Sequence, residues 1–245
     1  MRTRLTFQNG AEVTPVWSPD GTRIAYSSMA VAVGKNTLLT MSADGGDQQV
    51  LLEIQGGQAW ITDWSRDGRF LLFSRGDYVG GRSDVWLLPL DGGSPQMLVS
   101  AANYNDRAAF SPDGRWIAYR SNESGQAHIY ASAFNAPGAD GAPASLRGKW
   151  QVSSVAGATV DWRADGREIY YLTLEGDWMR AEVNGDGNQL HVGAVTKMFD
   201  CDPWYLGRIV CNASRDGQTF AVTTHLARDD QPVTLVLDWL TARDH

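Results

Sequence analysis

The sequence predicts an all-β fold, namely a β-propeller built from four-stranded antiparallel blades. Three observations lead to this prediction. First, a short segment ending in Asp-Gly occurs five times, and an apolar segment typical of a β-strand follows each copy. Second, the copies follow one another at steps of 47, 46, 52 and 51 residues, close to the length of a four-stranded propeller blade. Third, no long stretch has the hydrophobic period of an amphipathic helix.

The repeated segment, called the marker turn below, has the pattern aromatic-Ser-x-Asp-Gly. Glycine adopts the positive φ that a tight turn needs, and the aspartate side chain accepts backbone hydrogen bonds within the turn. We therefore interpret the marker aspartates as structural residues, and we expect the aromatics Trp17, Trp64 and Trp162 to pack between blades. The marker aspartates are Asp20, Asp67, Asp113, Asp165 and Asp216.

Each marker turn is expected to join the first two strands of a blade. The second strands are predicted at residues 24–26, 71–73, 117–119, 169–171 and 220–222. Third strands are clearest at 84–88, 128–131 and 233–237, and fourth strands at 50–52, 97–99 and 150–152. A second glycine-containing turn lies between the last two strands, and residues 135–148 form a longer insertion.

The two ends of the chain suggest how the propeller closes. Residues 3–7 form one strand before the first marker, and the last unit stops after its third strand. We predict that the N-terminal strand completes the last blade, with a seam between Leu5 and Leu235. This would give a single domain over residues 1–245, a closed ring of five blades without exposed sheet edges. A run of blades cut from a larger ring would show the same pattern, so this alternative stays open.

Charge and composition exclude several classes of function. The chain has 245 residues, with 21 Lys and Arg against 28 Asp and Glu, so its net charge is −7. Because such a surface repels phosphate backbones, we do not expect nucleic-acid binding. No segment is long and apolar enough to suggest membrane insertion, and no signal peptide is expected in this chain. Cys201 and Cys211 are expected to be free thiols, although a disulfide between them remains an alternative.

Two marker segments carry a resemblance to a known family. Residues Trp17–Tyr26 and Phe110–Tyr119 resemble the WSPDG repeat of TolB-like β-propellers. Residues 121–125 and 148–153 are similar to propeller modules that follow kinase domains in multidomain bacterial proteins. The resemblance implies a protein-binding or sensor module, within a longer polypeptide or alone, and suggests a periplasmic or other extracytoplasmic location. The sequence departs from the family pattern at Arg163-Ala164, at Ala213 and in the loop at 200–206.

Motifs for catalysis were sought without success. The sequence contains no G-x-S-x-G nucleophile turn, no phosphate-binding loop and no dinucleotide fingerprint. Its four histidines show no paired spacing, so we predict neither a catalytic residue nor a metal site. No cofactor is predicted either, and a cation such as calcium bound in the propeller channel remains an alternative.

Candidate binding residues lie in and before the innermost strand of each blade. Exposed aromatic and charged side chains there could contact a protein or peptide. A second set stands directly before the marker aromatic and could line the central channel, or could instead accept backbone N–H groups between blades. The partner-binding candidates are Trp60, Asp106, Arg107, Trp204 and Tyr205, and the channel-lining candidates are Asp63, Asp161 and Asn212.

These observations favour a noncatalytic protein- or peptide-interaction or sensor module. One alternative is a carbohydrate-binding protein or lyase-type enzyme that uses an acidic channel mouth. Another is a spacer module within a longer chain.

Overall fold

The computed structural model confirms an all-β propeller fold. It describes residues 5–6, 10–30, 35–76, 81–100, 104–200, 211–213, 219–222 and 234–237, and these residues form strands, turns and bends without a helix. Among the described residues, four sheets have four strands each and a further sheet has three. Within each sheet, strands consecutive in sequence pair antiparallel.

The sheets are called blades and are numbered along the chain. The first blade contains β1 (Ala11–Trp17), β2 (Arg23–Ala30), β3 (Lys35–Ser42) and β4 (Gln49–Gln55). The second contains β5 (Gln58–Trp64), β6 (Phe70–Gly76), β7 (Ser83–Pro89) and β8 (Gln96–Val99).

The third blade contains β9 (Asn105–Phe110), β10 (Trp116–Ser121), β11 (His128–Asn135) and β12 (Ser145–Gln151). The fourth contains β13 (Gly157–Trp162), β14 (Glu168–Thr173), β15 (Asp177–Asp186) and β16 (Gln189–Asp200). The last blade contains β17 (Cys211–Ala213), β18 (Thr219–Val222) and β19 (Thr234–Leu237).

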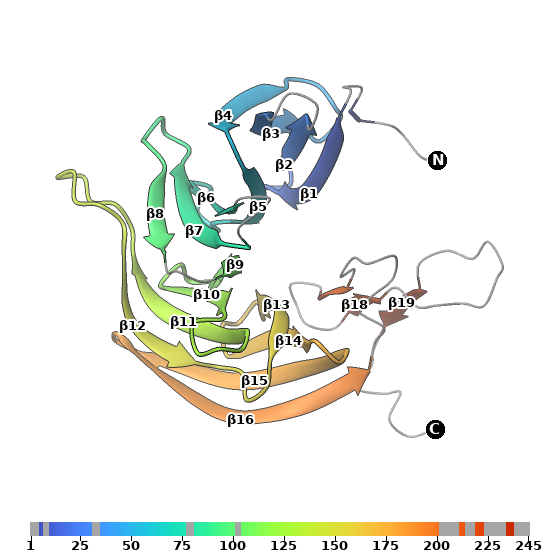
Figure 1. Cartoon of the computed structure of the whole chain (residues 1–245), viewed down its shortest axis with the longest axis vertical. Helices are drawn as coiled ribbons and strands as arrows, with labels where there is room; N and C mark the ends of the chain where they lie inside the picture. The colour runs from blue at the N-terminus through green and yellow to red at the C-terminus, as the bar shows by residue number, and fades with distance from the viewer. Residues whose placement is uncertain are drawn as a thin grey trace.

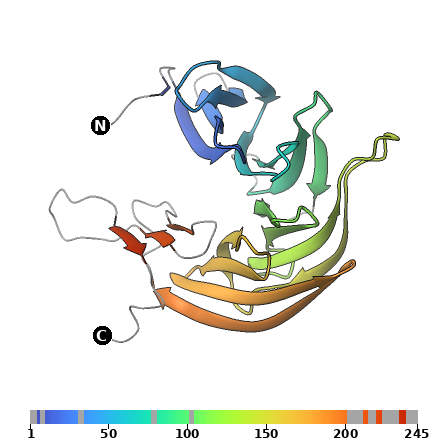
Figure 2. The same cartoon turned by 180° about the vertical axis from the view of Figure 1, so that it is seen from behind.

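The blades are arranged around a common centre, as Figures 1 and 2 show from opposite sides. In the first four blades, the first strand lies toward this centre and the fourth strand lies at the periphery. The insertion predicted at 135–148 appears as an extension of the β11–β12 hairpin that projects beside β8 (Figure 1). The first strands of different blades therefore meet at one place, although they are far apart in sequence.

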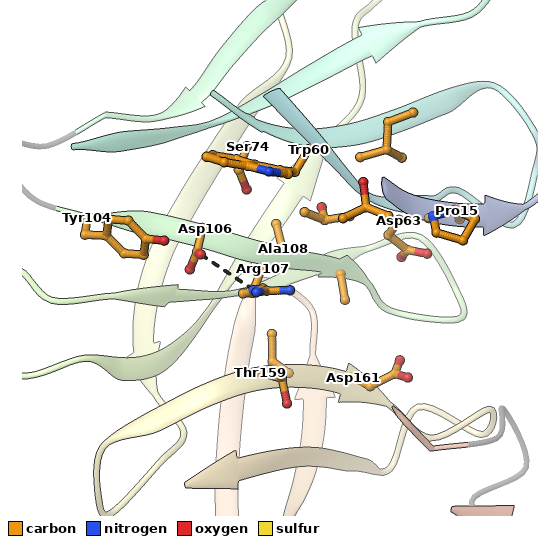
Figure 3. Close-up of a pocket in the computed structure, with 16 residues that line it drawn as sticks. Pro15, Trp60, Asp63, Ser74, Tyr104, Asp106, Arg107, Ala108, Thr159 and Asp161 are labelled. Atoms are coloured by element: carbon orange, nitrogen blue, oxygen red, sulfur yellow. Dashed lines mark ion pairs between the residues drawn. The ribbon is translucent and has the colours of Figure 1, made fainter. Parts of the chain in front are cut away.

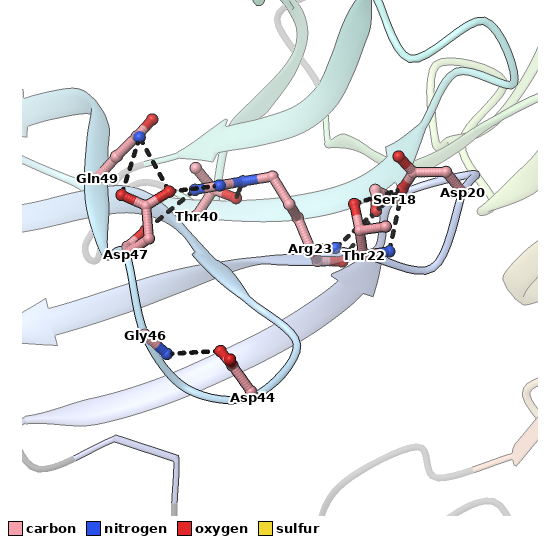
Figure 4. A network of polar contacts seen from close by, with 9 residues as sticks. All are labelled: Ser18, Asp20, Thr22, Arg23, Thr40, Asp44, Gly46, Asp47 and Gln49. Carbon is pink, nitrogen blue, oxygen red and sulfur yellow. Dashed lines mark hydrogen bonds and ion pairs between the residues drawn. The ribbon is translucent and has the colours of Figure 1, made fainter.

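The marker turns have the predicted structural role. In the first of them, Ser18 Oγ donates a hydrogen bond of 2.6 Å to Asp20 Oδ1 and accepts one of 2.9 Å from the Arg23 N–H. The same aspartate oxygen accepts the N–H and hydroxyl of Thr22 (Figure 4). Gly21 closes the turn at a φ of 72°, and equivalent glycines follow in the second, third and fourth blades. Because these groups are occupied within the turn, they are architectural.

Apolar clusters fill the spaces between successive blades. One joins the first and second blades around Trp64, one joins the second and third around Phe110, and one joins the third and fourth around Trp162. The marker aromatics of these three blades are thus buried between sheets, as expected. Trp17 is 51% exposed, and among the described residues none of the three clusters covers the face of the first blade that is turned away from the second. The packing of Trp17 between blades therefore stays a prediction.

The structure does not test the closure of the ring. Leu5 lies outside any strand and packs against the buried cluster of the first blade that contains Ile24, Tyr26, Leu39 and Met41. The last blade has three strands among the described residues. A five-bladed closed ring with its seam at Leu5 and Leu235 therefore stays a prediction, and the single domain over residues 1–245 likewise.

Candidate functional site

A cavity of about 600 Å³ lies where the first strands of four blades meet. Its walls come from β1, β5, β9 and β13, with Ser74 added from β6 and Tyr104 from the segment before β9. Figure 3 shows the side chains that point into it. We call this space the central cavity.

Irregularities in the first strands direct these side chains inward. Each of β1, β5, β9 and β13 has a register shift a few residues before its marker aromatic. Such bulges bend a strand and turn side chains away from the regular alternation. Thr14 and Arg107 occupy equivalent places, three residues before Trp17 and Phe110, and both have positive φ, at 50° and 53°. Positive φ is uncommon for residues other than glycine, so the backbone is strained at both positions.

Asp106 forms the strongest ion pair of the cavity wall. Its carboxylate accepts hydrogen bonds of 2.7 Å from Arg120 Nε and 2.8 Å from Arg120 Nη2, and both side chains are largely buried. Burial by itself lowers the pKa of Arg120, but the Asp106 carboxylate outweighs it and the pKa is raised. The Arg120 guanidinium also lies over the Tyr104 ring, 4.9 Å from its centroid. Burial, reinforced by Asp106, raises the pKa of Tyr104.

Arg107 is less engaged than Arg120. Its Nε lies 3.7 Å from Asp106 Oδ2, beyond hydrogen-bonding distance, and its side chain is 44% exposed. In Figure 3 the Arg107 side chain lies in the middle of the cavity, between Trp60 and Thr159. Trp60 is half-buried and pairs in register with Ser74 of β6. Arg107 therefore presents a cation to the cavity that Trp60 also lines.

Asp63 connects two blades. Its Oδ1 accepts the Trp64 N–H at 2.8 Å, and its Oδ2 accepts the N–H of Phe110 in the third blade at 2.7 Å. Asp161 holds the equivalent place in the fourth blade and accepts the Trp162 N–H at 2.8 Å. Asp63 therefore accepts a backbone N–H group between blades, as one of the two interpretations from the sequence proposed.

The structure brings five of the eight predicted residues to one cavity, namely Trp60, Asp63, Asp106, Arg107 and Asp161. Trp204 and Tyr205 lie outside the described residues, as does Cys201. Asn212 pairs with Ala221 through its backbone in β17, and its side chain is outside the description.

Sequence reasoning missed several contributors to this site, among them Arg120, Tyr104 and Ser74. Arg120 gave no usable sequence signal, because a regular hairpin would place it opposite Arg107 and only the register shift of β9 brings it opposite Asp106. Tyr104 and Ser74 gave no sequence signal, since each belongs to the cavity only through the packing of neighbouring blades.

The part of the chain that the structure describes carries neither a metal-binding cluster nor a membrane-spanning helix. Within it, no three His, Cys, Asp or Glu side chains are grouped so as to hold a metal ion. His128 contacts Ser153 Oγ at 3.1 Å in the third blade, away from His191 in β16. Among the described residues there is also no helix of the length and hydropathy needed to cross a membrane.

Comparisons with known proteins address the fold and the family. A family model described as "TolB beta propeller domain" matches residues 14–192. No curated protein matches the chain. Among solved structures, TolB from Acinetobacter baumannii superposes with a TM-score of 0.68 at 18% identity, over 94% of this chain and 52% of that one.

Two further structures are similar. A putative TolB from Agrobacterium tumefaciens has a TM-score of 0.57 at 22% identity, over 76% of this chain and 64% of its own. An oligogalacturonate lyase from Vibrio parahaemolyticus has a TM-score of 0.58 at 11% identity, over 89% of this chain and 64% of its own. The chain thus spans about half to two thirds of the length of these proteins, and at such identities the likeness shows the fold alone.

Proposed function

This chain belongs to the TolB beta propeller domain family, and from this membership we propose that it is a noncatalytic module that binds a protein or peptide at the central cavity. The observation that carries the proposal is that Trp60 and Arg107 both line one cavity of about 600 Å³. Tryptophan and arginine are the residue types most often responsible for binding energy at protein interfaces. A peptide side chain or chain end fits a cavity of this size.

The engagement of the carboxylates supports a noncatalytic role. A general acid or base must exchange a proton with its substrate. Both oxygens of Asp63 accept backbone N–H groups, and both oxygens of Asp106 accept the Arg120 guanidinium. These contacts occupy the carboxylate oxygens that would take the proton.

Carbohydrate binding, with or without lyase activity, is the second candidate. The cavity offers the half-buried Trp60 beside polar groups, and an aromatic face beside hydrogen-bonding groups also suits a sugar ring. The fold is shared with an oligogalacturonate lyase and with a periplasmic gluconolactonase of Pseudomonas aeruginosa. This candidate uses the same cavity, so one experiment can separate the two.

The experiment is selection from a random peptide display library on the immobilised chain, followed by affinity measurements on the enriched peptides. We expect binding that weakens about tenfold or more in Trp60→Ala and in Arg107→Gln, since removal of a central anchor costs about 2 kcal/mol. Met97→Ala is the matched control, because Met97 is 49% exposed on β8, away from the cavity.

Two results would contradict the proposal. The first is that no peptide is enriched, or that enriched peptides bind both cavity variants as well as the unmodified chain. The second is binding or cleavage of galacturonate oligomers that is lost in Trp60→Ala, which would favour the carbohydrate function.

A further inference from the structure

We infer that the central cavity recognises a carboxylate of the bound peptide and that Arg107 is the residue that binds it. The inference rests on the proposed peptide-binding function and adds the chemistry of the group recognised. Four features of the cavity support it.

The first feature is the free charge of Arg107. Its guanidinium has five N–H donors, and within the described residues its one charged contact is the 3.7 Å approach to Asp106. The side chain is 44% exposed, although it points into the cavity. A planar fork of donors matches the two oxygens of a carboxylate.

The second feature is Arg120, which acts as a positioning residue. It occupies both oxygens of Asp106 with hydrogen bonds of 2.7 and 2.8 Å, so Asp106 is already neutralised. Without Arg120, the Asp106 carboxylate would attract the neighbouring guanidinium of Arg107. The buried pair therefore keeps Arg107 available to a ligand.

The third feature is the backbone at Arg107. A φ of 53° is strained for arginine, and strain of this kind persists where the surrounding structure holds it, most often at functional sites. The strained residue sits at the register shift of β9 and carries its side chain toward the cavity centre (Figure 3). The strained backbone at Arg107 thus goes together with a side chain directed into the cavity.

The fourth feature is a pair of hydroxyl groups that lack partners. Ser74 is 2% exposed and lines the cavity, and its Oγ has no hydrogen-bond partner among the described atoms. Thr159 Oγ1, on the opposite side of Arg107 in Figure 3, is also buried without a partner. Buried polar groups are normally hydrogen-bonded, so these hydroxyls point to a polar occupant of the cavity.

The charges around the cavity disfavour a doubly charged anion more than a singly charged one. Three aspartates, Asp63, Asp106 and Asp161, stand against Arg107 and Arg120, and the chain as a whole carries −7. Asp63 and Asp161 lie across the view from Tyr104 and Asp106, with Arg107 between them (Figure 3). A phosphate dianion would be repelled more strongly than a carboxylate in this surrounding. The carboxylate can come from an acidic side chain or from a peptide C-terminus.

The test is an NMR titration of the full ¹⁵N-labelled chain, followed at the Arg107 Nε–Hε and Trp60 indole signals. Three probes are used at up to 10 mM: the amidated peptide acetyl-Leu-Ala-Glu-Ala-Leu, its glutamine analogue, and the glutamine analogue with a free C-terminus. We expect the glutamate peptide, the free C-terminal peptide, or both to shift these signals. The amidated glutamine peptide should bind about tenfold more weakly or worse.

Variants separate the roles of the two arginines. Arg107→Gln should weaken binding of the carboxylate peptide about tenfold, whereas Arg115→Gln, at an exposed marker-turn arginine, should leave it unchanged. Arg120→Gln should also weaken binding, although it does not touch the ligand. The double variant Asp106→Asn with Arg120→Gln should restore binding, because no buried charge is then left to capture Arg107. Circular dichroism and thermal melts confirm that each variant is folded.

The outcomes distinguish this inference from the proposed function. If the peptides bind equally with and without a carboxylate, or if Arg107→Gln binds like the unmodified chain, carboxylate recognition is wrong and peptide binding stands. If no peptide shifts the cavity signals, both are wrong. If a galacturonate oligomer binds through Arg107 and the peptides do not, the carboxylate belongs to a sugar and the peptide inference is overturned.

Discussion

At the scale of single residues, the described aspartates include three contrasting environments. Marker aspartates such as Asp20 accept hydrogen bonds within one turn. Asp63 accepts N–H groups from two different blades, and Asp106 is paired with Arg120. The residue type is the same, so the function of each carboxylate follows from the groups that surround it.

Asp20 makes the stability of the first marker turn dependent on pH. The hydroxyl of Ser18, the N–H and then the hydroxyl of Thr22 lower the pKa of Asp20 below its usual range. The ionised form is thus favoured in the folded chain, and its contribution is complete above about pH 4 and is lost as the pH falls through the lowered pKa. We expect Ser18→Ala to raise the pKa of Asp20 back toward its usual range in an NMR titration of its carboxyl carbon. Ser94→Ala, at an exposed serine of the second blade, is the control, and an unchanged Asp20 titration in Ser18→Ala would refute the assignment.

Asp63→Asn tests the connection between the second and third blades. An amide keeps one acceptor oxygen and places its NH₂ against a backbone N–H, so the bond to Phe110 or to Trp64 is lost. We expect the free energy of unfolding to fall by about 1–3 kcal/mol in urea denaturation. The control Asp186→Asn, at the exposed end of β15, should change it by less than about 0.5 kcal/mol. Equal effects of the two substitutions would show that the contact between blades contributes little.

At the scale of elements, the fourth blade shows how a marker turn tolerates loss of its serine. Arg163 stands in the serine position, and the Gly166 N–H still donates to its carbonyl at 2.9 Å. The Arg163 side chain instead pairs with the buried Glu168, at 3.2 Å from Nη1 to Oε1. The turn in the fourth blade is therefore maintained by its backbone hydrogen bond and its glycine. In the first three blades, the serine adds hydrogen bonds to a turn that forms without it in the fourth.

The extended β11–β12 hairpin is tied to the neighbouring blade. The Ala144 N–H donates to Gln96 Oε1 at 2.6 Å. Phe134 is 9% exposed and packs edge-on against Phe70 and Phe110, with ring centroids 6.3 and 5.6 Å apart. The insertion that the sequence showed is thus an ordered part of the interface between the second and third blades.

Phe134→Ala should therefore destabilise the whole chain. We expect a loss of about 3 kcal/mol in the free energy of unfolding, the low end for truncation of a buried phenylalanine. Val50→Ala, at a 58% exposed residue of β4, should cost less than about 0.5 kcal/mol in the same urea titration. A small effect of Phe134→Ala would mean that the hairpin folds independently of the second blade.

At the scale of the whole molecule, one face of the first blade carries residues whose equivalents in the third blade form an interface between blades. Ile24 and Tyr26 correspond to Ile117 and Tyr119, which in the third blade pack against the preceding blade. Trp17 corresponds in the same way to Phe110, yet it is 51% exposed. In a closed ring the last blade is next to the first, so the last blade would cover this face.

We therefore expect Trp17 to contact the last blade in solution. Trp17→Ala should speed amide hydrogen exchange in residues 219–222 and 234–237, because it removes the aromatic that the closed ring would bury. Trp150→Ala, which removes an aromatic packed on Trp116 in the third blade, controls for general destabilisation. Unchanged exchange of these segments in Trp17→Ala would indicate an open ring or a larger assembly.

Much of the fold could be predicted from the sequence, because its determinants are local. An Asp-Gly turn depends on residues a few positions apart, and alternating apolar residues define the strands that flank it. The four complete blades, the marker turns and the residues that reach the cavity from β5, β9 and β13 follow from this repeat. The positions of Asp63, Asp106 and Arg107 near the cavity were predictable for the same reason.

The tertiary structure alone decided how these residues are used. Asp63 binds Phe110, which is 47 residues away, and Asp106 is paired with Arg120, so two of the three predicted acidic candidates have their oxygens occupied in this way. Arg107 is left as the available charge, and Trp17, which shares its motif with Trp64, is exposed where Trp64 is buried. The physical reason is that a repeat specifies the interior of each blade, whereas hydrogen bonds, charge pairing and burial between blades depend on which sheets become neighbours.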